Sequence, residues 1–470
     1  MPPPPWTTGL PVPNPDVRLE AIGIRPYALP LRQPWTSAHG TRTERRGWLV
    51  QVQAAGVRGH GDCAPLPEAG TEAEAVAEGA LRLWQARLPG QSLAALLDPG
   101  RQSPYGEALG VSLKTPSPHP SPSRGEGVRE PADTLSEVLS EAKVGAQHVT
   151  LAGTPPGIGP TPAADFALEC ALTDLAARLA GVPLRRWLAP EANDRVPVNA
   201  TLGTLRDQTP ARVAAACQAG YRVLKLKVGL DAPETEIAHL RKLASHLPPG
   251  VSLRLDANGA WDYDQAARLI DQLNDLPIES LEEPLKFLEV PLKSTEGPPN
   301  PLKERMKSLE VPPKVPDWEA LRRLQAQARF ALALDESLHL PPPPMAIRDA
   351  VAPLLVDSFL SAGAPPVRRL VLKPAAVGGL RRTLFLAREA TRLGLEVVLT
   401  SLIESAAGLW PSLQLAAALS SPIPQGLATS HWLAQDLGRV PDPERGHIWL
   451  GRDSGSGFIP LRSAESDASD

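Results

Sequence analysis

Residues 221–284 decide the fold and read YRVLKLKVGLDAPETEIAHLRKLASHLPPGVSLRLDANGAWDYDQAARLIDQLNDLPIESLEEP. Three short apolar runs in this stretch are rich in Val, Leu and Ile and predict buried strands: 221–228, 251–257 and 278–284. Two longer amphipathic segments, 233–247 and 263–274, separate these runs and predict helices. The regular alternation of buried strands and helices is typical of a parallel sheet.

The same alternation continues on both sides of this stretch. Further strand-like runs lie at 196–202, 330–336, 369–375 and 395–401. Further helix-like segments lie at 210–220, 317–328 and 379–394. Seven or eight such units in roughly 250 residues predict an α/β fold of the TIM-barrel type over 191–440. A doubly wound open sheet is the alternative, although no GxGxxG sequence follows the first strand.

The region before the barrel has a different pattern. RLEAIGIRPYALPL (18–31) and GWLVQVQAAGVRGHGDCAPLP (47–67) predict antiparallel strands with glycine turns. Residues 71–88 predict a helix, and residues 165–181 predict a strongly amphipathic helix that ends at a glycine. We therefore predict a separate α+β domain over 16–190.

Proline-rich and low-complexity segments interrupt both domains. Residues 1–15 form a proline-rich tail, and an insertion at 102–160 contains TPSPHPSPSRGEG. A second insertion, broken by prolines, lies at 286–316. Segments of this composition do not form a packed core. We expect residues 441–470 to return to the first domain and to end in a disordered tail.

Carboxylates follow three successive barrel strands. Asp256 and Glu282 lie 26 residues apart, while Asp335 lies 53 residues after Glu282 because the insertion at 286–316 intervenes. Catalytic groups of such barrels lie at the C-terminal ends of strands, where three carboxylates would repel one another without a cation. One carboxylate alone would fit a helix cap equally well. All-oxygen ligation favours Mg²⁺, with Mn²⁺ or Ca²⁺ as alternatives.

Lysines occupy the same predicted layer. Lys225 and Lys227 are two residues apart on one strand and so point to one face, and Lys373 ends a later strand. The alternative is that Lys225 and Lys227 face outward among the helices. If they face inward, a neighbouring ammonium lowers the pKa of a lysine, which can then act as a general base. A metal on a substrate carboxylate would stabilise the ene-diolate formed by proton loss beside it.

The composition argues against other classes of protein. The formal net charge is −4 without a basic block, so we expect no nucleic-acid partner. No run approaches the roughly 20 apolar residues that span a membrane, and the first residues lack a signal-peptide pattern. We therefore expect no membrane partner and a soluble, cytoplasmic protein. Cys63, Cys170 and Cys217 show no CxxC spacing and are expected to be reduced.

The ordered short motifs resemble a known family. LKLKV, RLDAN, LEEP, ALDES and LKP follow one another on successive predicted strands. This set is similar to the muconate-lactonizing subgroup of the enolase superfamily, over roughly residues 16–465 apart from the two insertions. The resemblance implies a (β/α)7β barrel with an N-terminal α+β capping domain.

Within that subgroup the chain most resembles the o-succinylbenzoate synthases. Four stretches carry this likeness: GHGDCAPLP (59–67), ALECALTDLAAR (167–178), VPVNATLG (196–203) and TSLIESAAGL (400–409). The resemblance implies syn dehydration of 2-succinyl-6-hydroxy-2,4-cyclohexadiene-1-carboxylate to o-succinylbenzoate, a step toward menaquinone or phylloquinone. The implied partner is therefore a small-molecule carboxylate, and a homo-oligomer stays open.

The resemblance also implies roles for the charged residues. The ligands of Mg²⁺, or of Mn²⁺, would be Asp256, Glu282 and Asp335. Lys227 would remove the proton and return it to the departing hydroxyl. Lys225 would lower the pKa of Lys227 and touch the substrate carboxylate. Lys373 would stabilise the anionic intermediate from the opposite side of the barrel.

Weaker assignments follow from the same motifs. Ser401, Ile403 and Glu404, in the segment that looks like the family's substrate-carboxylate loop, join Lys225 as predicted substrate contacts. We predict that Arg254, Asn258 and Glu283 contact the metal ligands and do not bind the metal themselves.

Two other functions compete with this interpretation. An N-acylamino acid racemase or dipeptide epimerase of the same subgroup would use Lys227 and Lys373 as opposed acid–base lysines. Such epimerases often carry a DxD-type motif on the last strand, whereas residues 424–433 read PQGLATSHWL, which favours the dehydratase. The different-class alternative is a non-catalytic binding protein, and the intact set of ligands and lysines argues against it.

Overall fold

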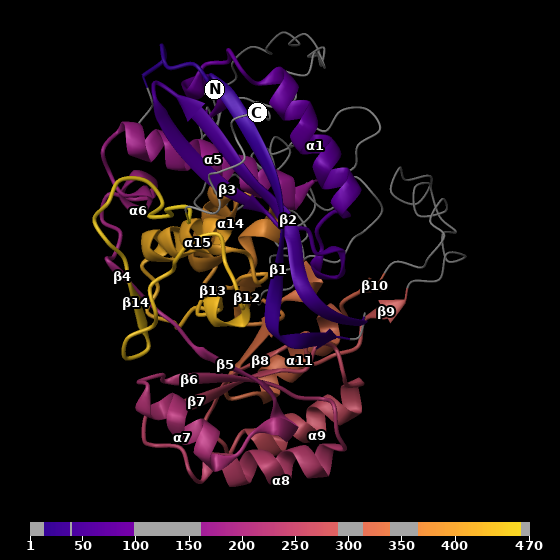
Figure 1. Ribbon diagram of the computed structural model, residues 1–470. Coiled ribbons are helices and arrows are strands. Elements are labelled where there is room, and N and C mark those ends of the chain that lie inside the picture. Colours follow the sequence, from indigo (N-terminus) through magenta and orange to yellow (C-terminus); the bar gives the residue numbers. More distant parts are fainter. Residues whose placement is uncertain (1–13, 38–39, 98–160, 290–313, 339–364, 462–470) are drawn as a thin grey trace, which may run out of the picture.

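The computed structural model describes residues 14–37, 40–97, 161–289, 314–338 and 365–461 (Figure 1). The N-terminal part, in indigo, lies at one end of the molecule, and the barrel strands lie toward the other end. The predicted insertion at 102–160, most of the first tail and the residues after 461 lie outside the described ranges.

Three antiparallel strands in the order β1-β2-β3 form the sheet of the N-terminal part, called the cap below. They are β1 Ala21–Ser37, β2 Gly40–Ala54 and β3 Val57–Cys63. The helical segments of this part are η1 Pro67–Ala69, α1 Glu74–Arg87, α2 Leu93–Leu96, α5 Pro162–Leu179 and α6 Leu184–Leu188. The long β1–β2 hairpin reaches down to the barrel, where Leu31 bridges Leu433.

Helix α5 lies directly against strand β3, and two glycines allow this contact. A Cβ atom at Gly59 would lie 2.1 Å from the carbonyl oxygen of Ala171, and one at Gly61 would lie 2.0 Å from that of Ala167. Fifteen of the eighteen residues of α5 are buried. The prediction of a strongly amphipathic helix is therefore wrong, because α5 packs against both the cap sheet and the barrel helices.

Seven parallel strands form the barrel in the order β5-β6-β7-β8-β11-β12-β13. They are β5 Ala200–Thr204, β6 Val223–Lys227, β7 Ser252–Asp256, β8 Ile278–Glu282, β11 Ala331–Leu334, β12 Arg369–Leu372 and β13 Glu396–Leu399. Gln425 bridges Val198 just before β5, and Gly426 bridges Thr400 just after β13. The predicted barrel fold is thus confirmed, with a minimal eighth strand between the two edges, and the open-sheet alternative is wrong.

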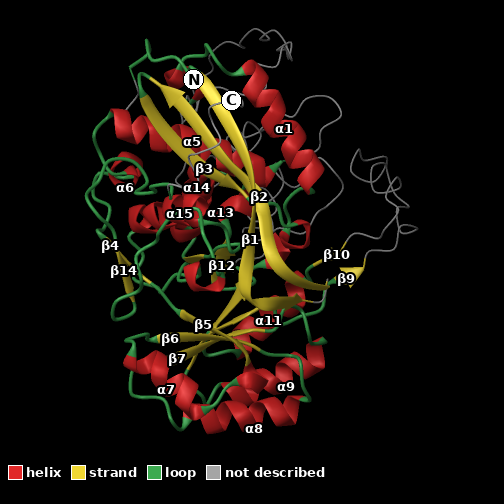
Figure 2. Ribbon diagram, viewed as in Figure 1, coloured by secondary structure: helices red, strands yellow, loops and turns green. Residues whose placement is uncertain are grey.

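Helices cover the outside of the barrel, and Figure 2 shows α7, α8 and α9 together beside strands β5, β6 and β7. The helical segments are η2 Leu205–Asp207, α7 Pro210–Gln218, α8 Pro233–Ala244, α9 Tyr263–Leu273, α11 Trp318–Gln327, η3 Glu336–Leu338, α13 Pro374–Val377, α14 Leu380–Arg392, α15 Ala406–Leu419 and η4 Ser430–Trp432. Local sequence sets where some of them begin. Asp262 and Gln265 form a reciprocal capping box at α9, and Asp317 caps α11. No helix within the described ranges is long and apolar enough to cross a membrane.

The segment predicted as an insertion at 286–316 begins and ends in a short ribbon. Strand β9 Leu288–Glu289 pairs in antiparallel fashion with β10 Lys314–Val315. The ribbon leaves the barrel after β8 and returns before α11. The predicted insertion at 286–316 therefore contains two short described strands, and residues 290–313 lie outside the described ranges.

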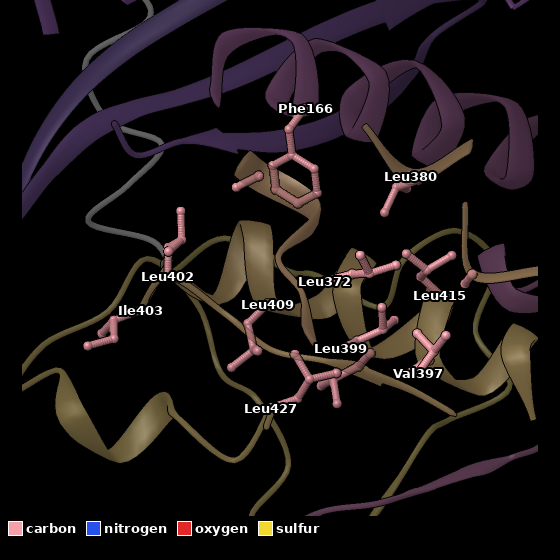
Figure 3. Packing of buried hydrophobic residues seen from close by; sticks show 14 of the residues in the cluster. Phe166, Leu372, Leu380, Val397, Leu399, Leu402, Ile403, Leu409, Leu415 and Leu427 are labelled. Atoms are coloured by element: carbon pink, nitrogen blue, oxygen red, sulfur yellow. The ribbon is translucent and has the colours of Figure 1, made fainter. Parts of the chain in front are cut away.

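One apolar core joins the cap to the barrel. Figure 3 shows Phe166 of α5 above Leu372, Leu380 and Leu399 of the barrel, all within the same buried cluster. The C-terminal segment adds a further link. Its strand β14 His447–Trp449 pairs with β4 Arg195–Pro197, and a later backbone N–H in the same segment donates to a buried carboxylate of α5.

Candidate active site

Lys225 and Lys227 of β6 both point into the barrel. Lys225 Nζ lies 2.9 Å from Asp256 Oδ2 and also donates to Glu282 Oε2. Lys227 Nζ donates to Asn258 Oδ1 at 3.0 Å. These partners end or follow the two neighbouring strands, so the alternative in which the lysines lie outside among the helices is wrong.

The three predicted carboxylates lie at one edge of the barrel. Asp256 of β7 is directly opposite Glu282 of β8, and Glu282 is opposite Ala333 of β11, two residues before Asp335. The three side chains belong to residues that are only 3%, 1% and 2% exposed. Acids buried this deeply need positive partners, and Lys225 contacts two of them.

Lys373 lies on the far side of the barrel from Lys227, because three strands separate β12 from β6. Its Nζ atom lies 2.7 Å from Asp335 Oδ1 and 3.6 Å from Glu336 Oε1. The Asn258 amide donates to the same Glu336 oxygen at 3.1 Å. A chain of polar contacts thus crosses from one lysine to the other. The sequence placed Glu336 beside Asp335 at the end of a predicted strand, but we predicted no role for it.

We call the seven residues of this edge the mouth layer: Lys225, Lys227, Asp256, Glu282, Asp335, Glu336 and Lys373. Its charges are unevenly balanced. Burial raises the pKa of Glu282, as do Asp256 and Asp335, although Lys225 opposes this. Burial and then Glu336 raise the pKa of Asp335. Asp256 is the exception, because the lysines of β6 outweigh its burial and lower its pKa.

The pKa of Lys225 shows which neighbours dominate. Burial alone would lower this pKa, but Asp256, Glu282 and Asp335 together raise it well above the ordinary value. The same balance applies to Lys373, where burial is outweighed by Asp335. The expected lowering of a lysine pKa by a neighbouring ammonium is therefore outweighed by carboxylates at these two lysines.

Two residues beside the predicted ligands have left-handed backbones. The φ angles are 45° at Asn258 and 42° at Glu283, and strained backbones of this kind gather at functional sites. The Glu283 carboxylate accepts the backbone N–H groups of Asp335 and Ser337 at 2.6 and 2.9 Å, and burial raises its pKa to about 8. Its side chain therefore holds the turn after β11 and does not enter the mouth.

The loop after β13 carries Ser401, Ile403 and Glu404. Because β12 and β13 are parallel and in register, this loop lies at the same barrel edge as Lys373. Ser401 Oγ accepts the Ile403 N–H at 3.2 Å, and Glu404 accepts the Leu402 N–H at 2.9 Å. Burial raises the pKa of Glu404 to about 7. The substrate contacts assigned to this loop stay predictions.

Arg254 forms its hydrogen bonds outside the mouth layer, although its positive charge opposes the rise in the pKa of Glu282. Its guanidinium donates to both oxygens of Glu279, at 3.1 and 3.2 Å, and to the Pro424 carbonyl at 3.1 Å. Arg254 and Asp256 share a face of β7, but the side chain of Arg254 extends toward the opposite end of the strands. Strand alternation fixes the face of a residue and leaves its hydrogen-bond partner open, and support of the metal ligands by Arg254 stays a prediction.

Arg254 instead belongs to a second charged layer, which we call the barrel floor: Arg254, Glu279, Arg369 and Glu396. Arg369 lies 2.6 Å from Glu279 and 2.6 Å from Glu396. These residues lie near the N-terminal ends of their strands. The floor therefore lies inside the barrel beneath the mouth layer, with arginines facing glutamates.

The mouth layer fits a cation by its chemistry. Within the described residues, no group of three or more His, Cys, Asp or Glu side chains is arranged to hold a metal ion. The ammonium of Lys225 lies between Asp256 and Glu282, where it takes the place of a cation, and Lys373 lies beside Asp335. The oxygens of the three carboxylates are thus held by ammonium groups inside the protein. Buried carboxylate oxygens of this kind suit a hard divalent ion.

Comparison with known proteins extends these observations. The family model described as Enolase C-terminal domain-like matches residues 208–292. An o-succinylbenzoate synthase from Thermobifida fusca is 31% identical over 254 residues, which cover 53% of this chain and 64% of that protein. One from Desulfotalea psychrophila is 28% identical over 59% of this chain and 65% of that protein. The matched region thus spans a little under two thirds of the length of these relatives.

Other relatives have different names. A chloromuconate cycloisomerase from Cupriavidus pinatubonensis is 27% identical over 54% of this chain and 57% of that protein. An L-Lys-D/L-Arg epimerase from Methylococcus capsulatus is 28% identical over 59% of this chain and 66% of that protein. Sequence similarity therefore extends to relatives with three different activities.

Solved structures share the fold of the whole chain. The muconate lactonizing enzyme of Pseudomonas fluorescens, complexed with muconolactone, has a TM-score of 0.64 at 19% identity and covers 95% of this chain and 98% of its own. The L-Ala-D/L-Glu epimerase of Bacillus subtilis has a TM-score of 0.64 at 21% identity, with coverages of 94% and 99%. The family match over residues 208–292, the sequence relatives and the shared barrel-and-cap fold all make this chain similar to proteins of the enolase superfamily.

Proposed function

We propose that this protein is an o-succinylbenzoate synthase, a lyase that dehydrates 2-succinyl-6-hydroxy-2,4-cyclohexadiene-1-carboxylate. The observation that carries the proposal is the placement of Lys227 and Lys373 on opposite sides of three buried carboxylates. Groups placed in this way can move a proton beside a substrate carboxylate. The relatives from Thermobifida fusca and Desulfotalea psychrophila bear this name and support the choice of reaction.

Lys227 is the base in this proposal. Its neutral amine takes the proton from the carbon beside the substrate carboxylate, and the electron pair of that bond forms a ring double bond as the C–O bond breaks. The resulting ammonium gives the proton to the departing hydroxyl, which leaves as water, so one group serves both steps of a syn elimination. Lys225 contacts the substrate carboxylate, and the ammonium of Lys373 stabilises negative charge from the opposite side.

Asp256, Glu282 and Asp335 are the proposed ligands of Mg²⁺, with Mn²⁺ as an alternative. A bound ion supplies positive charge that stabilises the substrate carboxylate as negative charge develops there. Binding requires the Lys225 ammonium to leave its place between Asp256 and Glu282. A dipeptide epimerase of Methylococcus capsulatus with the same fold was solved in complex with Mg, which supports the choice of ion.

A racemase or epimerase is the second candidate. The L-Lys-D/L-Arg epimerase relative and the epimerase structures with the same fold favour it. In that reaction Lys227 and Lys373 would take a proton from one face of a carbon and return it to the other. Residues 424–433, PQGLATSHWL, lack the DxD-type motif typical of such epimerases and so favour dehydration.

Two assays on one preparation test the proposal. The first follows dehydration with Mg²⁺ by ultraviolet absorbance, and the second follows loss of optical rotation of an N-succinylamino acid. We expect dehydration in wild type and a rate lower by about 10² to 10⁴-fold in Lys227→Ala. Folded wild-type protein that racemises without dehydrating would establish the second candidate, and protein that does neither would favour the non-catalytic alternative.

A further inference from the structure

The barrel loop Thr400–Ser405 has a strained backbone beside the mouth. Ile403 has a φ of 58°, in the left-handed region that β-branched residues rarely adopt. A conformation of this kind persists only where surrounding contacts fix it. The loop therefore needs partners outside its own sequence.

Asp62 of the cap strand β3 is one of these partners. Its Oδ2 atom accepts the backbone N–H of Ser405 at 2.7 Å and the Ser405 hydroxyl at 2.9 Å. Its Oδ1 atom accepts the Tyr27 hydroxyl at 2.5 Å, and the residue is 1% exposed. Ser405 is in turn the N-cap of α15. Asp62 thus joins a cap strand to the point where the barrel loop becomes a helix.

Arg45 of the cap strand β2 is a second partner from the cap, beside the barrel residues Gly426 and Thr429 that also bond to the loop. Its Nε atom donates to the Ile403 carbonyl at 3.3 Å, at the strained residue itself. Its two remaining nitrogens donate to the carbonyls of Ala64 and Pro65, at 2.8 and 3.1 Å, directly after β3. Arg45 is 1% exposed, so these bonds are shielded from water.

Gly408 of α15 is packed closely against both Asp62 of the cap and Glu404 of the loop. A Cβ atom at Gly408 would lie 2.8 Å from Glu404 Cβ and 3.0 Å from Asp62 Cβ. Leu402 and Ile403 lie at one edge of the apolar cluster in Figure 3. The loop has little room to move while the cap stays in place.

We propose that Asp62 and Arg45 are positioning residues, through which the cap sets the conformation of the barrel loop Thr400–Ser405. In the proposed enzyme this conformation fixes where Ser401 and Ile403 meet the substrate. That consequence rests on the proposed function, whereas the dependence of the loop on the cap does not.

Amide hydrogen exchange of the ligand-free protein tests the loop directly. In Arg45→Met and in Asp62→Ala, protection at Leu402, Ile403 and Ser405 should fall at least about tenfold, while the amides of β6, β7 and β8 stay protected. Asp62→Asn keeps an oxygen acceptor and should restore part of the protection. Gly408→Ala should loosen the same loop by displacement, without removing a charge.

Arg46→Met is the matched control, because Arg46 is adjacent on β2 but its side chain is 61% exposed and contacts Glu44. Protection of the loop should be unchanged in this variant. Loop protection that survives in Arg45→Met and Asp62→Ala would overturn the proposal. So would an equal loss in the barrel strands, since that would indicate a general loss of stability.

The kinetic arm separates positioning from folding. In Arg45→Met the KM for the dehydration substrate should rise about tenfold, with Mg²⁺ affinity within twofold of wild type. A loosened loop with an unchanged KM would show that the loop conformation does not matter to substrate. Failure of wild type to dehydrate would instead count against the proposed function, and the exchange result would still decide whether the cap holds the loop.

Discussion

The barrel contains two layers of charge, and they are built in opposite ways. In the floor, Glu279 accepts hydrogen bonds from both Arg254 and Arg369. Burial would raise the pKa of Glu279, but the two guanidiniums outweigh it and lower the pKa to about 2. Arginine stays charged in proteins and forms paired bonds with carboxylates, so this layer is complete without any ligand.

The mouth layer has more carboxylates than its lysines neutralise. The pKa values of Glu282 and Asp335 are raised by burial and by neighbouring acids. Perturbed acids of this kind are typical of functional sites. The difference teaches that the charges at one end of this barrel are paired with one another, whereas the other end has an excess of carboxylates, which we propose to bind a cation.

The largest expected effect falls on catalysis at the mouth. Lys227→Ala should lower kcat for dehydration by about 10² to 10⁴-fold, because the proton loses its acceptor. Its thermal midpoint should match wild type, since the described side-chain hydrogen bond of Lys227 is a single one to Asn258. Lys242→Ala, on the exposed surface of α8, is the control. A fully active Lys227→Ala enzyme would remove the base from the mechanism.

The next effect falls on stability at the floor. Glu279→Gln removes the charge that two buried arginines share and should lower the free energy of unfolding by about 3 kcal/mol in urea titrations at pH 7. Activity per folded molecule should change little. Glu319 of α11 forms an ion pair but its side chain is 70% exposed. The control variant Glu319→Gln should therefore change neither stability nor activity. If Glu279→Gln lost activity and kept its stability, the floor would serve catalysis and the account of the two layers would be wrong.

The floor also predicts a pH dependence. The pKa of Glu279 is lowered from 4.5 to about 2. The contribution of its charge to the free energy of unfolding is therefore complete above pH 4.5 and is lost as the pH falls toward 2. When the pH is lowered from 5 to 3, the free energy of unfolding of wild type should fall by about 2 kcal/mol more than that of Glu279→Gln. Urea unfolding of both proteins at the two values measures this difference. Parallel losses would show that the arginines do not hold Glu279 ionised.

The smallest expected effect concerns the metal at the mouth. Glu282→Gln keeps the size of a proposed ligand but removes its charge, so the Kd for Mg²⁺ should rise at least about tenfold, or 1.4 kcal/mol. Isothermal titration calorimetry on the substrate-free protein measures it. Glu283→Gln, next to it but turned toward the backbone of Asp335, should weaken Mg²⁺ less. If the two variants weakened Mg²⁺ binding equally, Glu282 would not be the specific ligand, which would contradict the proposed ligand set.

The sequence was sufficient to predict the barrel and to predict that charged residues lie together at the C-terminal ends of its strands. Period and spacing predicted each barrel strand, and alternation placed Lys225 and Lys227 on one face, which contacts between Lys225 and two neighbouring strands confirm. Partners at the floor were not predictable in the same way. The register shifts between Leu253 and Arg254, so Glu279 meets Arg254 through an irregularity that periodicity does not reveal.

Contacts between the cap and the barrel also could not be predicted from the sequence. Arg45 and Ile403 lie 358 positions apart, and Asp62 and Ser405 lie 343 apart. Their pairing depends on how two domains dock, which no local pattern encodes. The burial of α5 on both sides has the same origin, because only the docked domains enclose its polar face.

The dependence of the dehydration rate on Mg²⁺ tests the central claim most directly. Protein freed of metal by a chelator and then titrated with Mg²⁺ should show a rate that rises from background and saturates, as the mouth carboxylates exchange the Lys225 ammonium for the ion. Dehydration at full rate in the presence of excess chelator would contradict the account of the mouth layer as a cation site that serves proton removal.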